Sequence, residues 1–117
     1  MTAKTTQSKK SKGRRLQKKI VELILSKFKS LTKDDIWSRP MGCSGTDIVL
    51  SAAAAKVFPY EIEAKNTEKL NIWDAINQSQ QENRNPDRIP MVVFKKNGQE
   101  IYCCLKFNHF MNLLKGD

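Results

Sequence analysis

Two carboxylates and one lysine in the first half of the chain have the types and spacing for chemistry on a metal ion. Asp47 follows a glycine-containing stretch, and one residue separates Glu63 from Lys65. Side chains alternate between the two faces of a β-strand, so Glu63 and Lys65 would share a face. Two carboxylates from neighbouring strands can hold a divalent cation such as Mg²⁺, which favours oxygen ligands and keeps several waters. A lysine beside them can orient an attacking water or offset charge in a transition state.

The same residues also have a plainer interpretation. A strand face that carries Glu, Glu and Lys can be a solvated charged surface, and the pattern Glu-x-Lys is common. The surrounding pattern favours the chemical interpretation. A glycine-containing loop leads to an Asp at the start of a strand, and Glu-x-Lys then lies inside a short strand that a helix follows.

Hydrophobic periodicity predicts the elements that position these residues. We expect a mixed α/β fold with a small central sheet flanked by helices, in the order α-β-β-α-β-β-α. The predicted elements are a helix over 14–30, a loop over 32–46, a strand over 47–51, a turn or helical piece over 52–57, a strand from 58 to 65, a helix over 71–83, hairpin strands over 91–95 and 100–106, and a helix over 107–114.

The same periodicity predicts which faces are buried. One side of the first helix should pack on the core, whereas Glu22 should point to solvent. The residues of that side are Leu16, Ile20, Leu23, Ile24 and Phe28. The runs 92–94 and 102–105 are continuously apolar, which is typical of strands buried on both faces. The helix over 107–114 should close the domain.

The length and charge of the chain indicate a single domain that binds a polyanion. A chain of 117 residues has room for a single compact domain. The formal charge of +9 is concentrated near the start, because residues 2–19 carry eight basic side chains and no acid, while the other 13 basic residues nearly balance 12 acidic ones. Neutralising phosphates releases counterions, so a basic segment on a neutral body suits nucleic acid. We predict a disordered basic arm over 1–12 and a folded domain over 13–117; the plainer interpretation of 1–10 is a solvated tail.

The cysteines and the apolar pattern indicate the compartment. Cys43, Cys103 and Cys104 are odd in number, and two of them are adjacent, which favours a reduced cytoplasmic setting. The chain has no signal-peptide pattern and no apolar run of about 20 residues, so we expect a soluble protein without a membrane partner. The cysteines and His109 lack zinc-ligand spacing, so we expect no zinc, buried thiols and a structural histidine.

Segments 45–50 (GTDIVL) and 60–65 (YEIEAK) resemble the bipartite motif of the PD-(D/E)xK nuclease superfamily. The resemblance covers about residues 13–107 and implies a single restriction-endonuclease-like domain. It implies that Asp47 and Glu63 bind catalytic Mg²⁺, with Mn²⁺ able to substitute, and that Lys65 assists the attacking water. Thr46 stands where the family name has proline, and the spacing is slightly long.

Other parts of the site follow from the same resemblance. Segment 13–17 (GRRLQ) resembles the opening of the first helix in junction-resolving nucleases, where an acid occupies the position of Gln17. Gln17 would be a supporting ligand, or simply a polar residue beside the core face. Branches of the family place a glutamine on the helix after the Glu-x-Lys strand, and we expect Gln80, which shares a side with Trp73 and Ile76, to face the site. Glu61 would be a supporting carboxylate or an alternative metal ligand.

Loop and basic residues complete the predicted nucleic-acid surface. They are Lys12, Arg14, Arg15, Lys18, Arg39, Ser44, Lys95 and Lys96.

The resemblance implies a Mg²⁺-dependent endodeoxyribonuclease of the Holliday-junction-resolving type. Such enzymes act as homodimers on branched DNA, here in the cytoplasm of a bacterium or of a phage's host. Two alternatives stay open. One is a phage DNA-processing or restriction-like nuclease with the same catalytic residues, and the other is a non-catalytic DNA-binding module that kept the fold.

Overall fold

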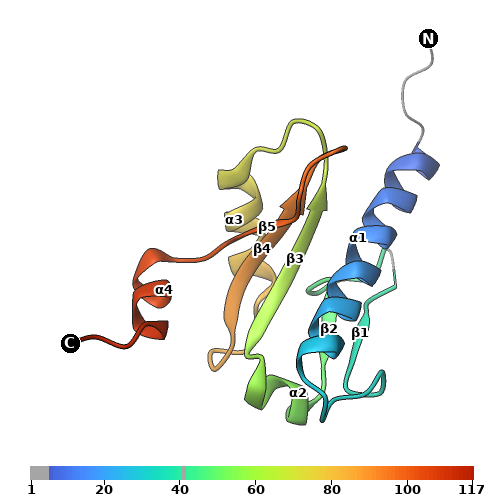
Figure 1. The fold of residues 1–117 in the computed structure, drawn as a ribbon. Coiled ribbons are helices and arrows are strands. Elements are labelled where there is room, and N and C mark those ends of the chain that lie inside the picture. The colour runs from blue at the N-terminus through green and yellow to red at the C-terminus, as the bar shows by residue number, and fades with distance from the viewer. Residues whose placement is uncertain (1–5, 41) are drawn as a thin grey trace.

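The computed structural model describes residues 6–40 and 42–117. In this part of the chain, helices and strands form a mixed α/β domain, as the sequence predicts, but the strands make two small sheets and not the one central sheet that was expected (Figure 1). In chain order the elements are α1 (Thr6–Lys27), β1 (Ile36–Ser38), β2 (Ile48–Leu50), α2 (Ala52–Val57), β3 (Tyr60–Asn66), α3 (Ile72–Glu82), β4 (Ile89–Lys95), β5 (Tyr102–Cys104) and α4 (Phe107–Leu113).

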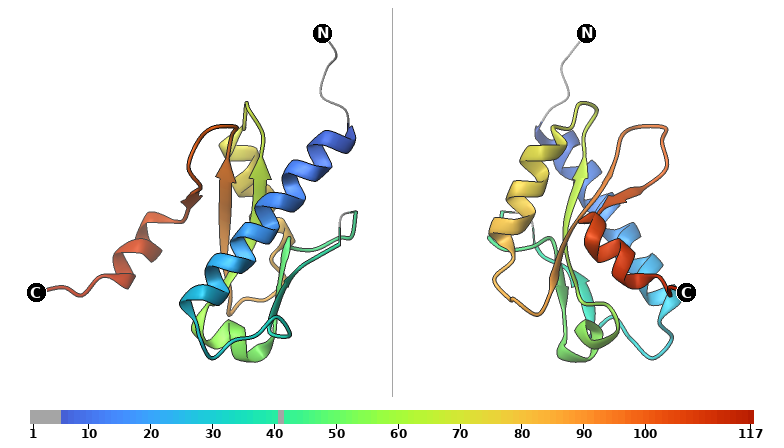
Figure 2. Two further views of the ribbon diagram at one scale, coloured as in Figure 1. Left: turned by 45° about the vertical axis from the view of Figure 1, so that its right-hand side comes forward. Right: turned by 90° about the vertical axis from the view of Figure 1, so that its left-hand side faces the viewer.

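β3 lies at the centre of this arrangement. β1 and β2 pair antiparallel, and in the second sheet β4 lies between β3 and β5. β3 and β4 run parallel and are joined through α3, whereas β4 and β5 form an antiparallel hairpin. α1 packs on β1 and β3, and α3 packs on β3 and β4 from the other side of the sheet (Figure 2). Side chains on the two faces of β3 therefore meet different helices.

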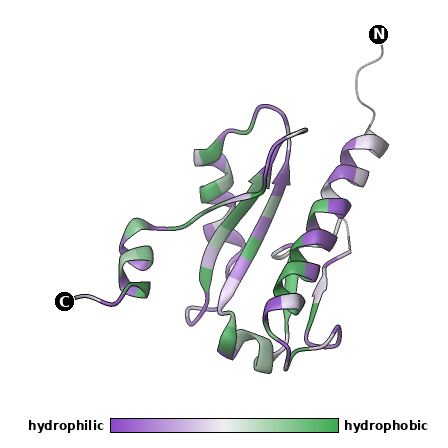
Figure 3. Ribbon diagram, viewed as in Figure 1, coloured by the Kyte–Doolittle hydropathy of each residue, from purple (hydrophilic) through white to green (hydrophobic). Residues whose placement is uncertain are grey.

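The hydrophobic core lies between α1 and the strands. Leu16, Ile20 and Ile24 lie on successive turns of α1 and are buried together with Ile48 and Ile62. Burying a side chain of this size contributes about 1.5–3 kcal/mol. Hydrophobic residues accordingly line the side of α1 that meets the strands (Figure 3). The predicted core face of the first helix is confirmed except at Leu23, which is 48% exposed, and Glu22 is exposed as expected.

α1 begins earlier than the sequence led us to expect. Residues 6–12 are the first turns of the helix rather than part of a disordered arm, and residues 1–5 of the predicted arm lie outside the described residues. Two contacts hold the start of α1 against the end of β3. Lys12 Nζ lies 3.6 Å from Glu68 Oε2, and Asn66 Nδ2 donates to the Lys12 carbonyl oxygen at 3.4 Å. The expectation that Lys12 is a DNA contact is corrected, because its side chain is buried.

The segment predicted as a loop over 32–46 contains the short strand β1. Ile36 is buried in this strand, whereas Trp37 and Ser38 are exposed. Three residues are too few to show a period of two in the sequence, and the strand forms because β2 pairs with it. The helical piece that follows β2 is confirmed as α2, and the Ser51 hydroxyl caps it by accepting from the Ala54 N–H at 3.1 Å.

The predicted hairpin is confirmed, but β5 is not buried. Gln99 N–H donates to the Lys96 carbonyl oxygen at 3.1 Å, and Gly98 takes a positive φ of 74° in this turn. Val92 and Val93 of β4 are buried as expected. β5 is a three-residue edge strand whose Tyr102 and Cys103 are exposed, so the prediction of buried thiols is wrong for Cys103. Cys43 is also exposed.

α4 forms where the sequence predicts a helix, yet it does not close the domain. It projects from the rest of the chain, beyond the end of β5 (Figures 1 and 2). Tyr60 Oη and His109 Nε2 share a hydrogen bond of 2.8 Å, and their rings meet edge to face. This contact gives His109 the structural role expected of it. No helix in the described part of the chain has the length and apolarity that crossing a membrane requires.

Candidate active site

Asp47 is held against the edge of β3 by two hydrogen bonds. Its N–H donates to the Ile62 carbonyl oxygen at 3.0 Å, and its Oδ2 accepts from the Ala64 N–H at 2.7 Å. Residues 62 and 64 flank Glu63, so these bonds hold the Asp47 carboxylate beside that residue. Burial is the largest influence on Asp47 and raises the pKa of its carboxyl group, and the Ala64 N–H opposes this effect. The two predicted carboxylates are therefore neighbours.

Glu63 is a buried carboxylate whose charge is only partly compensated. Its side chain is 5% exposed, and its Oε2 lies 3.5 Å from Lys65 Nζ. Its Oε1 is buried without a hydrogen-bond partner among the described residues. Burial, followed by the nearby Asp47, raises the pKa of Glu63 from 4.5 to about 7, although Lys65 opposes the rise. An unsatisfied buried carboxylate oxygen costs free energy unless a proton or a cation neutralises it.

Lys65 is held in place by a residue that the sequence did not single out. Its Nζ donates to Gln78 Oε1 at 2.7 Å and lies 3.5 Å from Glu63 Oε2. Gln78 belongs to α3, which covers this face of β3. The ammonium group is thus fixed between an amide oxygen and the buried carboxylate.

The expected glutamine, Gln80, lies elsewhere. It is exposed and lines a groove on another side of α3 together with Trp73 and Ile76. The sequence predicts that the side of α3 with these apolar residues faces the site, but α3 buries Ala75 and Ser79 instead. The small residues Ala75 and Ser79 indicate the side of α3 that faces the sheet, because small side chains let a helix approach a sheet closely.

Glu82 brings a third carboxylate close to the site. Its Oε2 accepts from the Gly45 N–H at 2.9 Å, which ties α3 to the loop before Asp47. Its charge raises the pKa of both Asp47 and Glu63. Gly45 has a φ of +108°, and a Cβ added there would lie 3.0 Å from the Arg39 guanidinium carbon. The positive φ favours glycine at this position, and a larger side chain would also displace the Arg39 guanidinium group.

Glu61 is engaged in a separate network. Its Oε2 accepts from the Thr46 hydroxyl and its Oε1 from Arg88 Nη1, both at 2.7 Å. Both oxygens of Glu61 thus have partners, and we correct its expected role as an alternative metal ligand. The network connects β3 to the loop before β2 and to the segment before β4.

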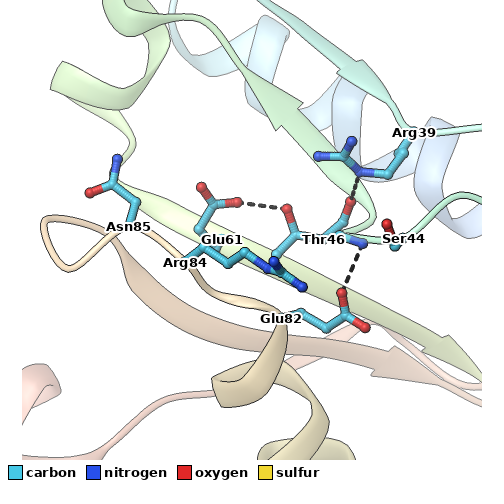
Figure 4. Close-up of a pocket in the computed structure, with 8 residues that line it drawn as sticks. Arg39, Ser44, Thr46, Glu61, Glu82, Arg84 and Asn85 are labelled. Carbon is cyan, nitrogen blue, oxygen red and sulfur yellow. Dashed lines mark hydrogen bonds between the residues drawn. The ribbon is translucent and has the colours of Figure 1, made fainter.

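A polar pocket of about 400 Å³ opens beside this network (Figure 4). Arg39 and Ser44, both predicted phosphate contacts, line it together with Arg84. Arg39 Nε donates to the Thr46 carbonyl oxygen at 2.6 Å, which orients the guanidinium group at the pocket. Arg84 lies after the end of α3 and is exposed, and it was not among the phosphate contacts predicted from the sequence.

The other predicted nucleic-acid contacts gather near one end of β3. Asn66, at that end, pairs with Lys95 in the sheet and contacts the start of α1 through its bond to Lys12. Arg14, Arg15 and Lys18 are exposed on α1, Lys96 is exposed beside the hairpin turn, and Lys95 is half-buried. Gln17 is buried beside Leu16 on α1, so its role as a supporting ligand remains a prediction.

The residues present fit a divalent cation. No cluster of three or more His, Cys, Asp or Glu side chains within residues 6–40 and 42–117 has the geometry of a metal site. Mg²⁺ does not need such a cluster, because it binds through one or two carboxylates and keeps its waters. Asp47 and Glu63 supply such a pair, and Glu63 Oε1 is buried without a partner in the described part of the chain. Comparisons with known proteins found no matching family model, no matching curated protein and no matching solved structure.

Proposed function

We propose that this chain is a Mg²⁺-dependent endodeoxyribonuclease with a restriction-endonuclease-like fold of the PD-(D/E)xK type. The observation that carries the proposal is the pair formed by half-buried Asp47 and buried Glu63, in which Glu63 Oε1 has no partner among the described residues and Lys65 lies alongside. Two carboxylates with raised pKa values are costly to bury next to one another. A bound cation would neutralise the two carboxylates and offset this cost.

Each residue has a task in phosphodiester hydrolysis. A divalent cation, when bound, would polarise the attacking water and offset phosphate charge. Asp47 and Glu63 would hold that cation, and the two hydrogen bonds to β3 keep Asp47 in position. Lys65, oriented by Gln78, would place its ammonium group where negative charge develops on the phosphate. Mn²⁺, which also accepts carboxylate ligands, should replace Mg²⁺.

The surface around the site suits DNA. Exposed basic residues of α1 and the hairpin turn lie near the end of β3 that carries Lys65, and Arg39 and Arg84 line the pocket beside Glu61. Phosphate contacts of this kind position a duplex without reading its sequence. We therefore favour recognition of DNA structure, as in Holliday-junction resolution in a bacterial or phage-infected cytoplasm.

Two other functions share part of this support. A phage DNA-processing or restriction-like nuclease would use the same Asp47, Glu63 and Lys65. A non-catalytic DNA-binding module would use only the basic surface. The module explains less, because carboxylates near phosphates weaken binding and Glu63 is buried at a cost in stability.

A cleavage panel separates these functions. Linear, flapped, Y-shaped and four-way DNA with identical arm sequences would be incubated with the chain and Mg²⁺, Mn²⁺ or EDTA. We expect metal-dependent cleavage, with the four-way substrate cut at least about tenfold faster than the linear one. Equal rates on all substrates would favour the general nuclease. Salt-dependent DNA binding without cleavage in Mg²⁺ or Mn²⁺ would support the non-catalytic DNA-binding module.

The two glutamines of α3 provide a matched pair of variants. Gln78→Leu should lower kcat by about 10- to 100-fold, because the Lys65 ammonium loses the amide that orients it. Gln80→Leu removes the same amide from an exposed position and should leave kcat unchanged. Single-turnover cleavage of the preferred substrate measures both variants. Equal losses in the two variants would contradict the assignment of Gln78.

A further inference from the structure

A row of side chains runs across the sheet from the candidate active site. Lys65 of β3 pairs with Phe94 of β4, and Phe94 pairs with Tyr102 of β5. Side chains of paired residues lie on the same face of a sheet, and this face is the one that meets α3, since Lys65 Nζ donates to Gln78. Adjacent strands lie about 4.8 Å apart, so Phe94 is one strand and Tyr102 two strands, or about 10 Å, from Lys65. Two aromatic residues therefore lie beside the site, on the face that carries Glu63 and Lys65.

The two aromatic residues line a cavity of about 490 Å³. It opens between the segment 67–72, which joins β3 to α3, and the β4–β5 hairpin, and both lie at the same end of the sheet (Figure 2). Ligand pockets commonly have volumes of about 300–1,000 Å³ and combine apolar walls with a few polar groups. The lining residues here include the apolar Leu70, Ile72, Phe94 and Tyr102 and the basic Lys95 and Lys96. The cavity thus has the size and composition of a ligand site.

The two rings are oriented to receive a flat ligand. Their centroids lie 6.3 Å apart and their planes differ by 27°, so the rings of Phe94 and Tyr102 are close to parallel. Tyr102 is 60% exposed on the edge strand β5, and its ring is therefore open to a ligand. Proteins that bind single-stranded nucleic acid stack its bases on aromatic side chains of this kind.

The charges around the cavity favour a ligand that carries phosphate. Glu68 is among the lining residues, but its Oε2 lies 3.6 Å from Lys12 Nζ and accepts from the Asn97 N–H at 2.8 Å. Outside this ion pair the lining residues carry two positive charges and one negative charge, that of Glu100. An uncharged apolar ligand would make no use of the two lysines, whereas a nucleotide has both a ring to stack and a phosphate to neutralise.

We propose that this cavity holds an unpaired nucleobase of the DNA strand that passes the candidate active site. The base would stack on Tyr102 beside Phe94. Phosphates next to the base would contact Lys95 and Lys96. This subsite rests on the proposed nuclease function and adds its substrate class, which is DNA with an unpaired base close to the cleaved phosphate. Bases of one strand lie about 3.4 Å apart, so the row of about 10 Å from Lys65 to Tyr102 spans about three nucleotides.

Stacking on a side chain selects a base that has left the duplex. A paired base is stacked between its neighbours and presents only its edges in the grooves. Moving it out of the duplex costs free energy, and the cost is lowest for a mismatched or single-stranded base. The cavity would therefore direct the chain to branched, flapped or looped DNA. It would do so without reading the sequence, because every base has a face that can stack.

DNA binding without metal tests the subsite separately from cleavage. Three duplexes of one sequence would carry, at one position, an extra unpaired base, an abasic residue in its place, or no extra nucleotide. In EDTA, the wild type should bind the first with a Kd at least about tenfold lower than the second, which has the same backbone charge. Tyr102→Ala should remove this difference, whereas Tyr102→Phe should keep it because the ring remains. Phe107→Ala, which removes another exposed ring outside the cavity, should behave as wild type.

The outcomes for the subsite and for the nuclease function are distinguishable. Equal affinities of the wild type for the unpaired-base and abasic duplexes, with metal-dependent cleavage intact, would overturn the subsite alone. Discrimination between these duplexes without cleavage in Mg²⁺ or Mn²⁺ would retain the base site in a non-catalytic DNA-binding module. A wild type that bound none of the three duplexes would overturn both.

Photocrosslinking locates the base directly. A 5-iodouracil at the unpaired position, irradiated in the complex in EDTA, should crosslink to Tyr102 or Phe94, and mass spectrometry of the digested complex identifies the peptide. The same base in a paired position should crosslink at least about tenfold less. Crosslinks confined to residues outside the cavity would overturn the assignment even if the unpaired base strengthened binding.

Discussion

Replacing Asp47 with asparagine should lower the rate of DNA cleavage at least about a thousandfold while the chain stays folded and binds DNA. A thousandfold loss corresponds to about 4 kcal/mol of transition-state stabilisation, which a metal ligand can supply. Asparagine keeps an oxygen that can accept from the Ala64 N–H, so the hydrogen bond that holds residue 47 against β3 is retained. The variant loses the negative charge that the cation needs.

Cleavage and binding have to be measured separately for this result to be informative. Single-turnover cleavage with Mg²⁺ gives the rate, and titration of DNA in EDTA gives the Kd. Asp34→Asn is the matched control, because it makes the same change of charge at an exposed position outside the site. If Asp47→Asn kept more than about a tenth of wild-type activity, Asp47 would not be a metal ligand.

Replacing Glu63 with glutamine should abolish cleavage and yet stabilise the protein at pH 8. In the folded chain the pKa of Glu63 is about 7, above the ordinary glutamate value of 4.5. Between these values the folded state binds more protons than the unfolded state, so the contribution of Glu63 to stability falls as pH rises from about 4.5 to 7. Above pH 7 a buried charge beside Asp47 remains. Glutamine removes that charge and should raise the free energy of unfolding by about 2–3 kcal/mol.

Urea denaturation at pH 5 and pH 8 in EDTA measures this effect. The difference between variant and wild type should be small at pH 5, where Glu63 is protonated, and large at pH 8. Mg²⁺ should then stabilise the wild type at pH 8 but not Glu63→Gln, because a ligand stabilises only the form that binds it. Glu22→Gln, at an exposed position of α1, should show neither effect. A Glu63→Gln variant that was less stable than wild type at pH 8 would contradict the account of the site.

The catalytic pair and the support around it differ in how far the sequence could predict them. Glu63 and Lys65 share a face because of the two-residue period of a strand, which is a local property. The position of Asp47 beside Glu63 follows from a glycine-containing loop that delivers it to the next strand. The partners of Glu61 could not be predicted in this way, since Arg88 lies 27 residues further along the chain and meets Glu61 only when β4 pairs with β3.

The sequence by itself determined the mixed α/β class, the core face of α1 and the alternating faces of β3, because backbone geometry sets these patterns. The tertiary structure alone decided which side of α3 faces the site, so that Gln78 rather than Gln80 meets Lys65. It also decided that β5 and α4 remain exposed. The physical reason is the same in each case. A run of apolar residues looks the same in the sequence whether its side chains are buried in the core or exposed on the surface. Only the packing of the elements against one another shows which of the two occurs.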